Sequence, residues 1–399
     1  MSQRHWTPVT LVVILGLLLA ASADSHTQNL LAALPTEVAA PSDNPTTPEK
    51  VALGRLLFWD PILSGQKDVA CASCHHPDFG YAENLDLSIG ANGVGLGAAR
   101  TFPPDRPLRF VKRNSQTVLN TAFNGVTATG HDTPASAPMF WDLRVRSLEL
   151  QALEPLKAQE EMRGDAYPEH LALSSVVARL KANAEYRRLF TSAFGPREPV
   201  SEATLGRALA AFERSLVTPN APFDRYMRGD QTAMTSAQVR GLGRFETVGC
   251  VNCHNGPMFS DYKSHVIAVP DSSKLAVSDA GINQTYAFRT ASLRNLAYTA
   301  PYMHSGVFGS LGEVVNFYNR VGRGGRGGRG GGQGGRRGGG TQNPNVTRDQ
   351  LDPLVLRLNL RGGRQDDLVA FLGALNDPDF DRTIPAQVPS GLPVGGRIR

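Results

Sequence analysis

The sequence has few cysteines and few aromatic residues. Only 4 of its 399 residues are cysteine, and aromatic residues make up 7%. A chain of this length can bury one or two hydrophobic cores, so it is not a short peptide held together by disulfides. Hydrophobic residues make up 41% and charged residues 19%, with 41 glycines and 27 prolines. This composition predicts a globular protein with many loops and excludes a wholly disordered chain.

Long hydrophobic runs are also scarce. Residues 9–21 are mostly apolar and uncharged, but these 13 residues fall short of the roughly 20 that span a bilayer. The run lies between a weakly basic start and an Ala-Ser-Ala sequence, so residues 1–23 are predicted to be a cleaved secretory signal rather than an uncleaved anchor. No later segment is long and apolar enough to form a stable membrane span. We therefore expect a periplasmic or secreted protein.

The net charge is +5, which by itself would favour binding to nucleic acid or to an anionic membrane. The excess is local, because residues 322–340 consist of 13 glycines, five arginines and one glutamine. The rest of the chain is nearly neutral and gives no reason to expect a nucleic-acid partner. This Gly/Arg stretch cannot form a packed core, so we expect an insertion loop. It is predicted to be a solvated linker, with contact to an anionic partner as the alternative.

All four cysteines fall into two copies of one motif. The copies are Cys71-Ala-Ser-Cys74-His75 and Cys250-Val-Asn-Cys253-His254. In the C-x-x-C-H motif both thiols form thioethers with one haem, and the adjacent histidine binds the iron. A redox disulfide does not need the histidines, a zinc site of four thiolates does not explain them, and chance does not account for the use of every cysteine. The sequence therefore predicts two covalently bound c-type haems, which fits an exported protein.

The two motifs have similar surroundings. A segment with helical apolar spacing precedes each one, at residues 48–58 and 236–245, and an asparagine follows each one, Asn120 and Asn295. An internal duplication is the simplest explanation. Apolar positions three and four apart in residues 171–216 predict further helices, whereas strand patterns are sparse.

These patterns predict a mainly α fold with two cytochrome c-like haem domains and long loops. The expected order is a flexible leader at 24–47, an N-terminal haem domain at 48–235, a C-terminal haem domain at 236–383 that contains the Gly/Arg stretch, and a tail at 384–399. A helix at residues 365–375 is expected to close the second domain.

Three further motifs resemble those of one family. They are LGRLLFWDPILSG at residues 53–65, FWDLRVRSLELQ at 140–151 and LRNLAYTAPYMHSG at 293–306. With the two attachment sites in this order, the sequence from about Pro48 to Pro378 is similar to the bacterial di-haem cytochrome c peroxidases, including the methylamine-utilisation (MauG-type) enzymes. The resemblance implies that the first haem is the peroxidatic one and that the second passes electrons to it.

The resemblance also implies roles for individual residues. His75 and His254 would be the proximal iron ligands. Gln151 and Glu161, ten residues apart as in the family, would line the distal pocket of the first haem. There Gln151 would orient the peroxide, and Glu161 would move a proton from its inner to its outer oxygen, although such residues are more often surface helix residues. Trp141 matches the tryptophan that relays electrons between the haems, although tryptophan is more often a core residue.

The distal ligands distinguish the branches of the family. Where members need reductive activation, a histidine after Ser-Ile-Gly closes the first haem, but here Ala91 follows residues 88–90. Alanine cannot bind iron, so the first haem is expected to be open without activation; His76 follows the proximal ligand too closely to replace it, and His131 is expected in a loop. Tyr318 stands where the second haem has methionine in typical peroxidases and tyrosine in MauG-type enzymes; the alternative is a core tyrosine.

The family also has a calcium ion between the haems, held by a side-chain oxygen and two backbone carbonyls. These ligands would correspond to Asn114, Thr299 and Pro301. Such an ion would hold the two domains in register.

We therefore expect a di-haem oxidoreductase that reduces hydrogen peroxide with electrons passed through the second haem. The electron donor would be a small protein, a cytochrome c or a cupredoxin. One alternative is MauG-type oxidation of a partner protein or another organic substrate. A second alternative is a non-catalytic electron carrier, in which protein ligands close both irons.

Overall fold

A computed structural model of the chain describes residues 30–197, 199–323, 342–360 and 365–399. The predicted secretory signal lies outside the described residues, and so does the Gly/Arg stretch apart from its first two residues. Within the described ranges, no helix combines the length and the apolar character needed to cross a membrane.

The regular secondary structure of the described residues is mostly helical, with a few short strands. The α-helices are α1 (Pro48–Trp59), α2 (Cys71–Cys74), α3 (Leu148–Gln151), α4 (Glu154–Lys157), α5 (Ala172–Ala182), α6 (Ala184–Phe194), α7 (Glu202–Ser215), α8 (Pro222–Met227), α9 (Ser236–Thr247), α10 (Leu311–Arg323), α11 (Pro353–Leu356) and α12 (Gln365–Gly373). The strands form two antiparallel pairs, β1 (Pro138–Met139) with β2 (Val145–Arg146) and β3 (Ser264–Val266) with β4 (Ala287–Arg289). The expected mainly α fold is confirmed.

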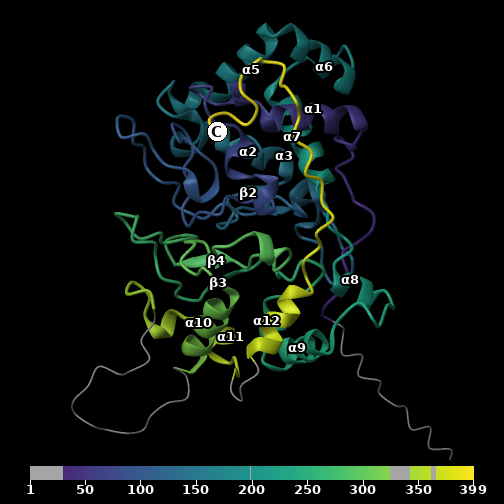
Figure 1. Ribbon diagram of the computed structural model, residues 1–399, viewed down its shortest axis with the longest axis vertical. Helices are drawn as coiled ribbons and strands as arrows, with labels where there is room; N and C mark the ends of the chain where they lie inside the picture. Colours follow the sequence, from purple (N-terminus) through teal and green to yellow (C-terminus); the bar gives the residue numbers. More distant parts are fainter. Residues whose placement is uncertain (1–29, 198, 324–341, 361–364) are drawn as a thin grey trace, which may run out of the picture.

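The elements divide into two halves, each with its own hydrophobic core (Figure 1). The first half contains α1 to α7, and its core is built largely from α1, α5, α6 and α7. The second half contains α8 to α12, and its two hydrophobic clusters are built largely from α8, α9 and α12 and from α10 and α11. Phe223 of α8 belongs to the second core. The division therefore lies before α8 and not at residue 235, because the chain crosses to the second half before the second repeat begins.

The described part of the N-terminal segment packs against the folded halves. Leu34 is buried, and its backbone N–H donates to the buried carboxylate of Asp224 at 2.8 Å. Asn44 is also buried and donates to Glu149 at 2.9 Å. The expectation of a flexible leader is therefore wrong for residues 30–47, because these contacts attach the segment to both halves.

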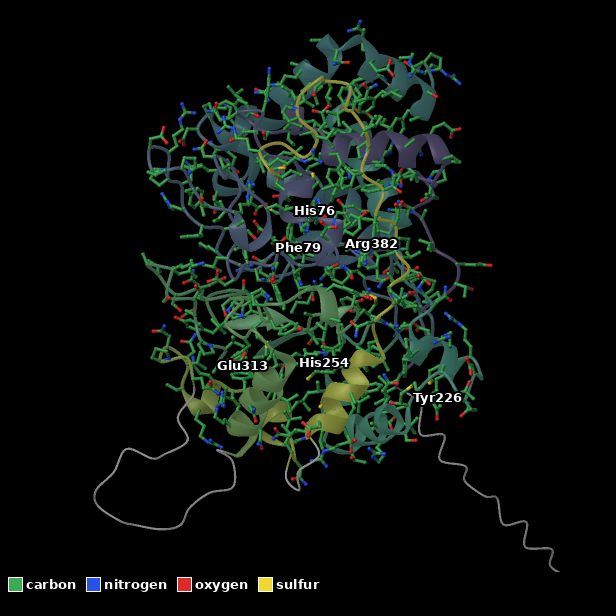
Figure 2. All side chains as sticks on the ribbon, in the orientation of Figure 1. His76, Phe79, Tyr226, His254, Glu313 and Arg382 are labelled. Atoms are coloured by element: carbon green, nitrogen blue, oxygen red, sulfur yellow. The ribbon has the colours of Figure 1, made fainter. Side chains whose placement is uncertain are left out.

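The C-terminal segment returns to the first half. In Figure 1 the yellow chain leaves α12 and runs back to the region of α5. Val388 is buried in the first core, and Ser73 Oγ donates to the carbonyl oxygen of Gly395 at 2.8 Å. Arg382, labelled in Figure 2, donates to the carbonyl oxygen of Pro77 at 3.0 Å. Residues 384–399 thus form part of the first half rather than a separate tail.

Both halves contain a close helix crossing at a glycine of their first long helix. In the first half α1 crosses α7 at Gly54, where a Cβ atom would lie 2.1 Å from the carbonyl oxygen of Ala208. In the second half α9 crosses α12 at Gly241, where a Cβ atom would lie 1.9 Å from the carbonyl oxygen of Asp367. Only glycine allows the backbones to approach this closely.

The aromatic packing beside the two crossings is repeated as well. Phe58 of α1 meets Phe212 of α7 with ring centroids 5.2 Å apart, and Phe245 of α9 meets Phe371 of α12 at the same distance. In both cases the phenylalanine lies four residues after the crossing glycine, on the same helix face. These pairs place equivalent side chains in the two cores.

The asparagine that follows each attachment motif has an equivalent position. Asn120 and Asn295 both adopt the left-handed conformation, with φ of 63° and 62°. Their Nδ2 atoms donate to the same Thr218 Oγ1, at 2.6 and 2.9 Å. Because the repeats have the same crossing glycine, aromatic pair and asparagine, the structure supports the internal duplication.

Candidate functional site

A cavity of about 640 Å³ is lined by residues of both halves. Both C-x-x-C-H motifs lie on its wall, one from each half. Every site residue predicted from the sequence also lines it. The tertiary structure therefore brings these residues, which are far apart in the chain, to one shared cavity.

The four cysteines are free thiols on the cavity wall. Desolvation raises the pKa of Cys71 and of Cys250 to about 12, so these thiols keep their protons in the absence of a bonded partner. Across the described residues, one group of three or more side chains has metal-ligand spacing, and it consists of Cys253, Asp261 and His265. This group contains a single cysteine, which argues against a zinc site built from all four thiolates.

Both ring nitrogens of His265 form hydrogen bonds with aspartates. Its Nε2 lies 3.0 Å from Asp261 and its Nδ1 lies 2.6 Å from Asp352. The hydrogen bond to Asp261 is the largest of the effects that raise the pKa of His265 to about 11. A protonated ring has no lone pair for a metal ion, so we assign this histidine to an ion-pair network.

His75 and His254 share one local geometry. His75 Nδ1 lies 3.0 Å from the carbonyl oxygen of Tyr81, and His254 Nδ1 lies 2.9 Å from that of Phe259. An Nδ1–H that donates to a carbonyl leaves Nε2 as the nitrogen with a lone pair. Desolvation lowers the pKa of both histidines and keeps the rings neutral. Free thiol pairs followed by neutral histidines on a cavity wall fit one c-type haem in each half.

Gln151 and Glu161, both in the first half, line the cavity. Burial raises the pKa of the Cys74 thiol, and Glu161 is close enough to raise it further. Gln151 is the last residue of α3, and Glu161 lies in the helical turn Gln159–Arg163. Desolvation raises the pKa of Glu161 to about 7, although Arg144 opposes this shift. A carboxyl with a pKa near neutrality can both accept and donate a proton at physiological pH.

Ala91 is buried and does not line the cavity. The two histidines considered as substitutes, His76 and His131, are also absent from its wall. His76 accepts a hydrogen bond from the backbone N–H of Asp78, and its ring lies edge-on to Trp59. His131 is exposed. Neither histidine is therefore in a position to close the first haem.

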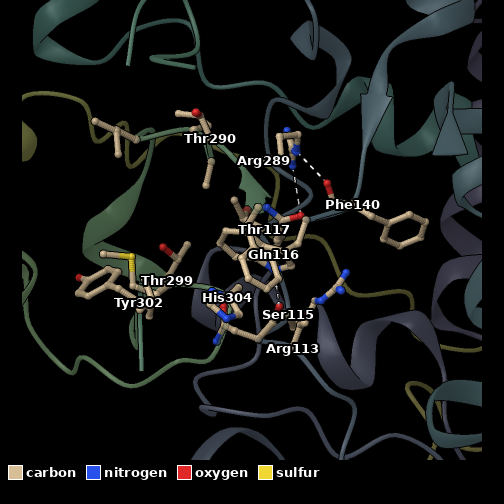
Figure 3. A pocket seen from close by; sticks show the side chains of 18 of the residues that line it. Arg113, Ser115, Gln116, Thr117, Phe140, Arg289, Thr290, Thr299, Tyr302 and His304 are labelled. Atoms are coloured by element: carbon tan, nitrogen blue, oxygen red, sulfur yellow. Dashed lines mark hydrogen bonds between the residues drawn. The ribbon is translucent and has the colours of Figure 1, made fainter. Parts of the chain in front are cut away.

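Trp141 lies where the two halves meet. Its Nε1–H donates to the carbonyl oxygen of Asn114 at 3.0 Å. Its ring packs edge-on to His304, which is labelled in Figure 3, at 6.3 Å. The His304 ring stacks on Phe288 with centroids 3.6 Å apart. The backbone N–H of Arg289 donates to the carbonyl oxygen of Trp141 at 2.7 Å. The indole is thus held between elements of both halves.

The three predicted calcium ligands line this same cavity. Asn114 Nδ2 donates to the carbonyl oxygen of Leu85 at 2.8 Å, which turns the amide so that its oxygen is the remaining polar atom. The backbone N–H of Asn114 donates to the carbonyl oxygen of His304 at 2.7 Å. Asn114 is thereby linked to the chain segment that contains Thr299 and Pro301.

Tyr318 of α10 lines the cavity on the side of the second motif. Desolvation raises the pKa of its phenol, and the nearby Cys253 and Cys250 raise it further. This proximity places Tyr318 beside the second attachment site. A phenol with a raised pKa ionises when a metal ion binds its oxygen.

Glu213, His304 and Arg289 are among the cavity residues that were not predicted from the sequence. Glu213 of α7 is buried, and desolvation raises its pKa to about 8. His304 is buried, and its Nε2 has no hydrogen-bond partner among the described residues. Arg289 is buried at the end of β4. His304 lies in the 293–306 motif, which could have drawn attention to it, whereas nothing in the sequence distinguishes Glu213 or Arg289.

Comparisons with known proteins identify the family. The family model for di-haem cytochrome c peroxidases matches residues 48–232. The methylamine utilization protein MauG of Methylorubrum extorquens is 37% identical over 92% of this chain and 90% of its own length. The cytochrome-c peroxidase IdrP1 of a Pseudomonas species is 34% identical over 92% of both chains. The chain belongs to the di-haem cytochrome c peroxidase family.

Solved structures agree with this assignment. A MauG-like protein associated with microbial copper homeostasis has a TM-score of 0.65 and 28% identity, and the match covers 86% of this chain and 95% of that chain. The di-haem peroxidase BthA of Burkholderia thailandensis has the same fold, with a TM-score of 0.60 at 23% identity over 87% of this chain and 94% of that chain. As a family member, the protein is an oxidoreductase with two c-type haems.

Proposed function

We propose that the protein reduces hydrogen peroxide to water at the first haem, with Glu161 as the acid–base group. A haem iron with an open position supplies a site for peroxide and, together with the second haem, the two electrons that the reaction consumes. Two electrons and two protons convert one peroxide into two water molecules. The observation that carries the proposal is the cavity position of Glu161 together with a pKa raised to about 7.

The residues around the first motif have distinct tasks in this proposal. Glu161 takes the proton of the inner peroxide oxygen and returns it to the outer oxygen, which then leaves as water. Gln151, which also lines the cavity, orients the peroxide through its amide. Cys71 and Cys74 would attach the first haem, and His75 would bind its iron.

The remaining assignments concern the second haem and the architecture. We propose that Cys250 and Cys253 attach it, that His254 and Tyr318 bind its iron, and that Trp141 relays electrons between the haems. A calcium ion at Asn114 and the 299–301 segment would hold the halves in register. The two halves would be cytochrome c-like domains of a periplasmic or secreted enzyme.

Replacing Glu161 by glutamine tests the peroxidase proposal. Glu161→Gln keeps the shape of the side chain but cannot carry the proton, so we expect peroxide turnover with a reduced donor protein to fall 10²- to 10⁴-fold. The haem content and the ferric spectrum should stay those of the natural protein. Glu160, which also lines the cavity, provides the control, and Glu160→Gln should change turnover less than tenfold. Equal turnover in Glu161→Gln and the natural protein would refute the role.

A second function, oxidation of a partner protein or another organic substrate, is favoured by two observations. Ala91 leaves the first haem without a loop ligand, and Tyr318 rather than a methionine lies beside the second attachment site. A phenolate ligand stabilises oxidised iron more than a thioether does. Addition of stoichiometric peroxide without a donor distinguishes the two functions: a long-lived two-electron-oxidised state favours this second one, and rapid decay favours the peroxidase.

The Tyr318 assignment has its own test. Tyr318→Phe removes the phenolic oxygen and keeps the ring, so we expect the low-spin ferric signal of the second haem to convert to a high-spin signal in electron paramagnetic resonance. Tyr302→Phe, a change of another tyrosine on the cavity wall, is the control and should leave that signal as it is. An unchanged low-spin signal in Tyr318→Phe would show that another group binds the iron.

A further inference from the structure

Four arginines line the cavity, and three of them are paired with aspartates. Arg113 binds Asp142 and Asp279, Arg144 also binds Asp142, and Arg294 binds the buried Asp224. These pairs neutralise the guanidinium groups within the protein.

Arg289 is the exception. Its side chain is buried, with 6% of the residue exposed, and it has no carboxylate partner among the described residues. Its Nε donates to the carbonyl oxygen of Phe140 at 2.8 Å and its Nη2 donates to Gln116 Oε1 at 3.2 Å (Figure 3). Both acceptors are neutral, and Nη1 has no hydrogen bond to any described residue. Among the described residues the Tyr262 ring, 5.7 Å from the guanidinium carbon, faces the charge, but no carboxylate neutralises it.

Residues next to Arg289 lie near the predicted iron ligands of both haem sites. Gln116, which accepts its Nη2–H, follows Ser115, whose Oγ lies 3.3 Å from His75 Nδ1. Ala291, two residues after Arg289, lines the cavity together with His254. Arg289 is thus linked to the surroundings of His75 and lies on the same cavity wall as both predicted proximal ligands.

A buried unpaired cation is costly. Removing a charged group from water costs several kcal/mol even after the protein relaxes, and an anion with good hydrogen-bond geometry offsets this cost. Guanidinium groups favour carboxylates because both are planar and can form two parallel hydrogen bonds. Each c-type haem has two propionate side chains, and these are carboxylates.

We propose that Arg289 binds a propionate of one of the two haems. Nη1 and the second N–H of Nη2 would provide the donors, while the bonds to Phe140 and Gln116 hold the guanidinium in place. The proposal depends on the two haems of the family and not on the reaction that they perform. Loss of peroxide turnover in another variant would therefore leave it unaffected.

The expected consequence is a higher reduction potential of that haem. A positive charge at the propionate favours the reduced iron, which has one positive charge fewer than the oxidised iron. Replacing Arg289 by glutamine removes the charge and keeps hydrogen-bonding capacity. We expect the equilibrium constant for reduction of that haem to fall at least tenfold, which corresponds to about 59 mV for one electron.

The experiment is a spectroelectrochemical titration of both haems in holoprotein, combined with resonance Raman spectra of the propionate bending bands. The variants are Arg289→Gln and Arg289→Lys, and the control is Arg144→Gln. Arg144 also lines the cavity, but its side chain is 42% exposed and paired with Asp142, so its loss is screened by solvent. Raman spectra of samples with only one haem reduced identify which haem has the affected propionate.

A lower potential and a shifted propionate band at one haem in Arg289→Gln, both absent in Arg144→Gln, support the proposal and identify the haem. Arg289→Lys retains the charge but not the forked donor geometry. It should therefore restore the potential while the propionate band stays shifted, and it serves as the test if Arg289→Gln does not incorporate haem. Propionate bands unchanged in every folded Arg289 variant would overturn the proposal. A shift of potential equal to that of Arg144→Gln would also overturn it.

Discussion

Glu161 shows how a single residue depends on its surroundings. In water a glutamate is ionised at neutral pH, but desolvation at the cavity raises the pKa of Glu161 to about 7. The nearby carboxylates Glu160 and Glu154 raise it further, and Arg144 lowers it. The same shift that suits the residue for proton transfer also makes its ionised form unfavourable in the folded protein.

This shift predicts opposite pH dependences for activity and stability. Because the base form of Glu161 accepts the peroxide proton, turnover should rise as pH increases through about 7. The folded pKa lies above the unfolded value, so the contribution of Glu161 to the free energy of unfolding should fall as pH rises from 4.5 to about 7 and then level off. Glu161→Gln does not titrate, and its stability relative to the natural protein should therefore increase from pH 5 to pH 8 in chemical denaturation of the holoprotein. A difference that is constant with pH would contradict the shifted pKa.

At the scale of elements, the two helix crossings position the haem sites. Capping fixes where the crossing helices begin: the pair Ser201 and Thr204 caps α7, and the pair Thr235 and Gln238 caps α9. The glycine on α1 or α9 then lets the backbones touch, and the neighbouring aromatic pair fills the core beside the cavity. The sequence showed the helices, but the partner of each helix depends on contacts between segments distant in the chain.

The crossings predict the effect of adding one methyl group. Gly54→Ala and Gly241→Ala would place Cβ 2.1 and 1.9 Å from a backbone oxygen, so the helices must move apart. We expect each variant to lose about 1–3 kcal/mol of unfolding free energy. Gly243→Ala, also on α9, meets no atom within 4 Å and should instead gain up to about 1 kcal/mol. Denaturant titration of the three variants checks this, and equal stabilities of Gly241→Ala and Gly243→Ala would show that the crossing is not tight.

At the scale of the whole molecule, Thr218 joins the repeats. Its Oγ1 accepts hydrogen bonds from Asn120 of the first half and from Asn295 of the second, and all three residues are buried. Its backbone N–H also donates to Asn120 Oδ1 at 2.8 Å. The halves therefore meet at a polar junction as well as at the cavity.

Removing the shared acceptor oxygen of Thr218 should lower the free energy of unfolding of the protein. Thr218→Val has the same shape but leaves two buried amide groups without an acceptor, at a cost of about 1–3 kcal/mol for each group. Thr218→Ser keeps the oxygen and loses one methyl group, so it should cost about 1 kcal/mol. We expect a lower denaturation midpoint for Thr218→Val than for Thr218→Ser in the holoprotein. The reverse order would show that packing of the methyl group, and not the shared oxygen, holds the junction.

Some segments of the fold and some residues of the site could be predicted from the sequence, and others could not. Residues 48–58 and 236–245 have local periodicity, and α1 and α9 appeared where it predicted helices. The leader at 30–47 and the segment after 383 lack such periodicity, and their packing depends on cores formed elsewhere. Every predicted site residue lines the cavity, whereas the positions of Arg289 and Glu213 on its wall could not be predicted, because burial and the absence of a counter-ion are properties of the assembled structure.

The sequence by itself determined the covalent chemistry and the family, because the spacing of two thiols and a histidine is local in the chain. It also determined the helical character, through periodicity. Only the tertiary structure decided which groups share the cavity, which of its arginines is left without an aspartate, and that the pKa of Glu161 lies near neutrality. Charge pairing and desolvation depend on distances between segments far apart in the sequence, and these distances exist only in the folded molecule.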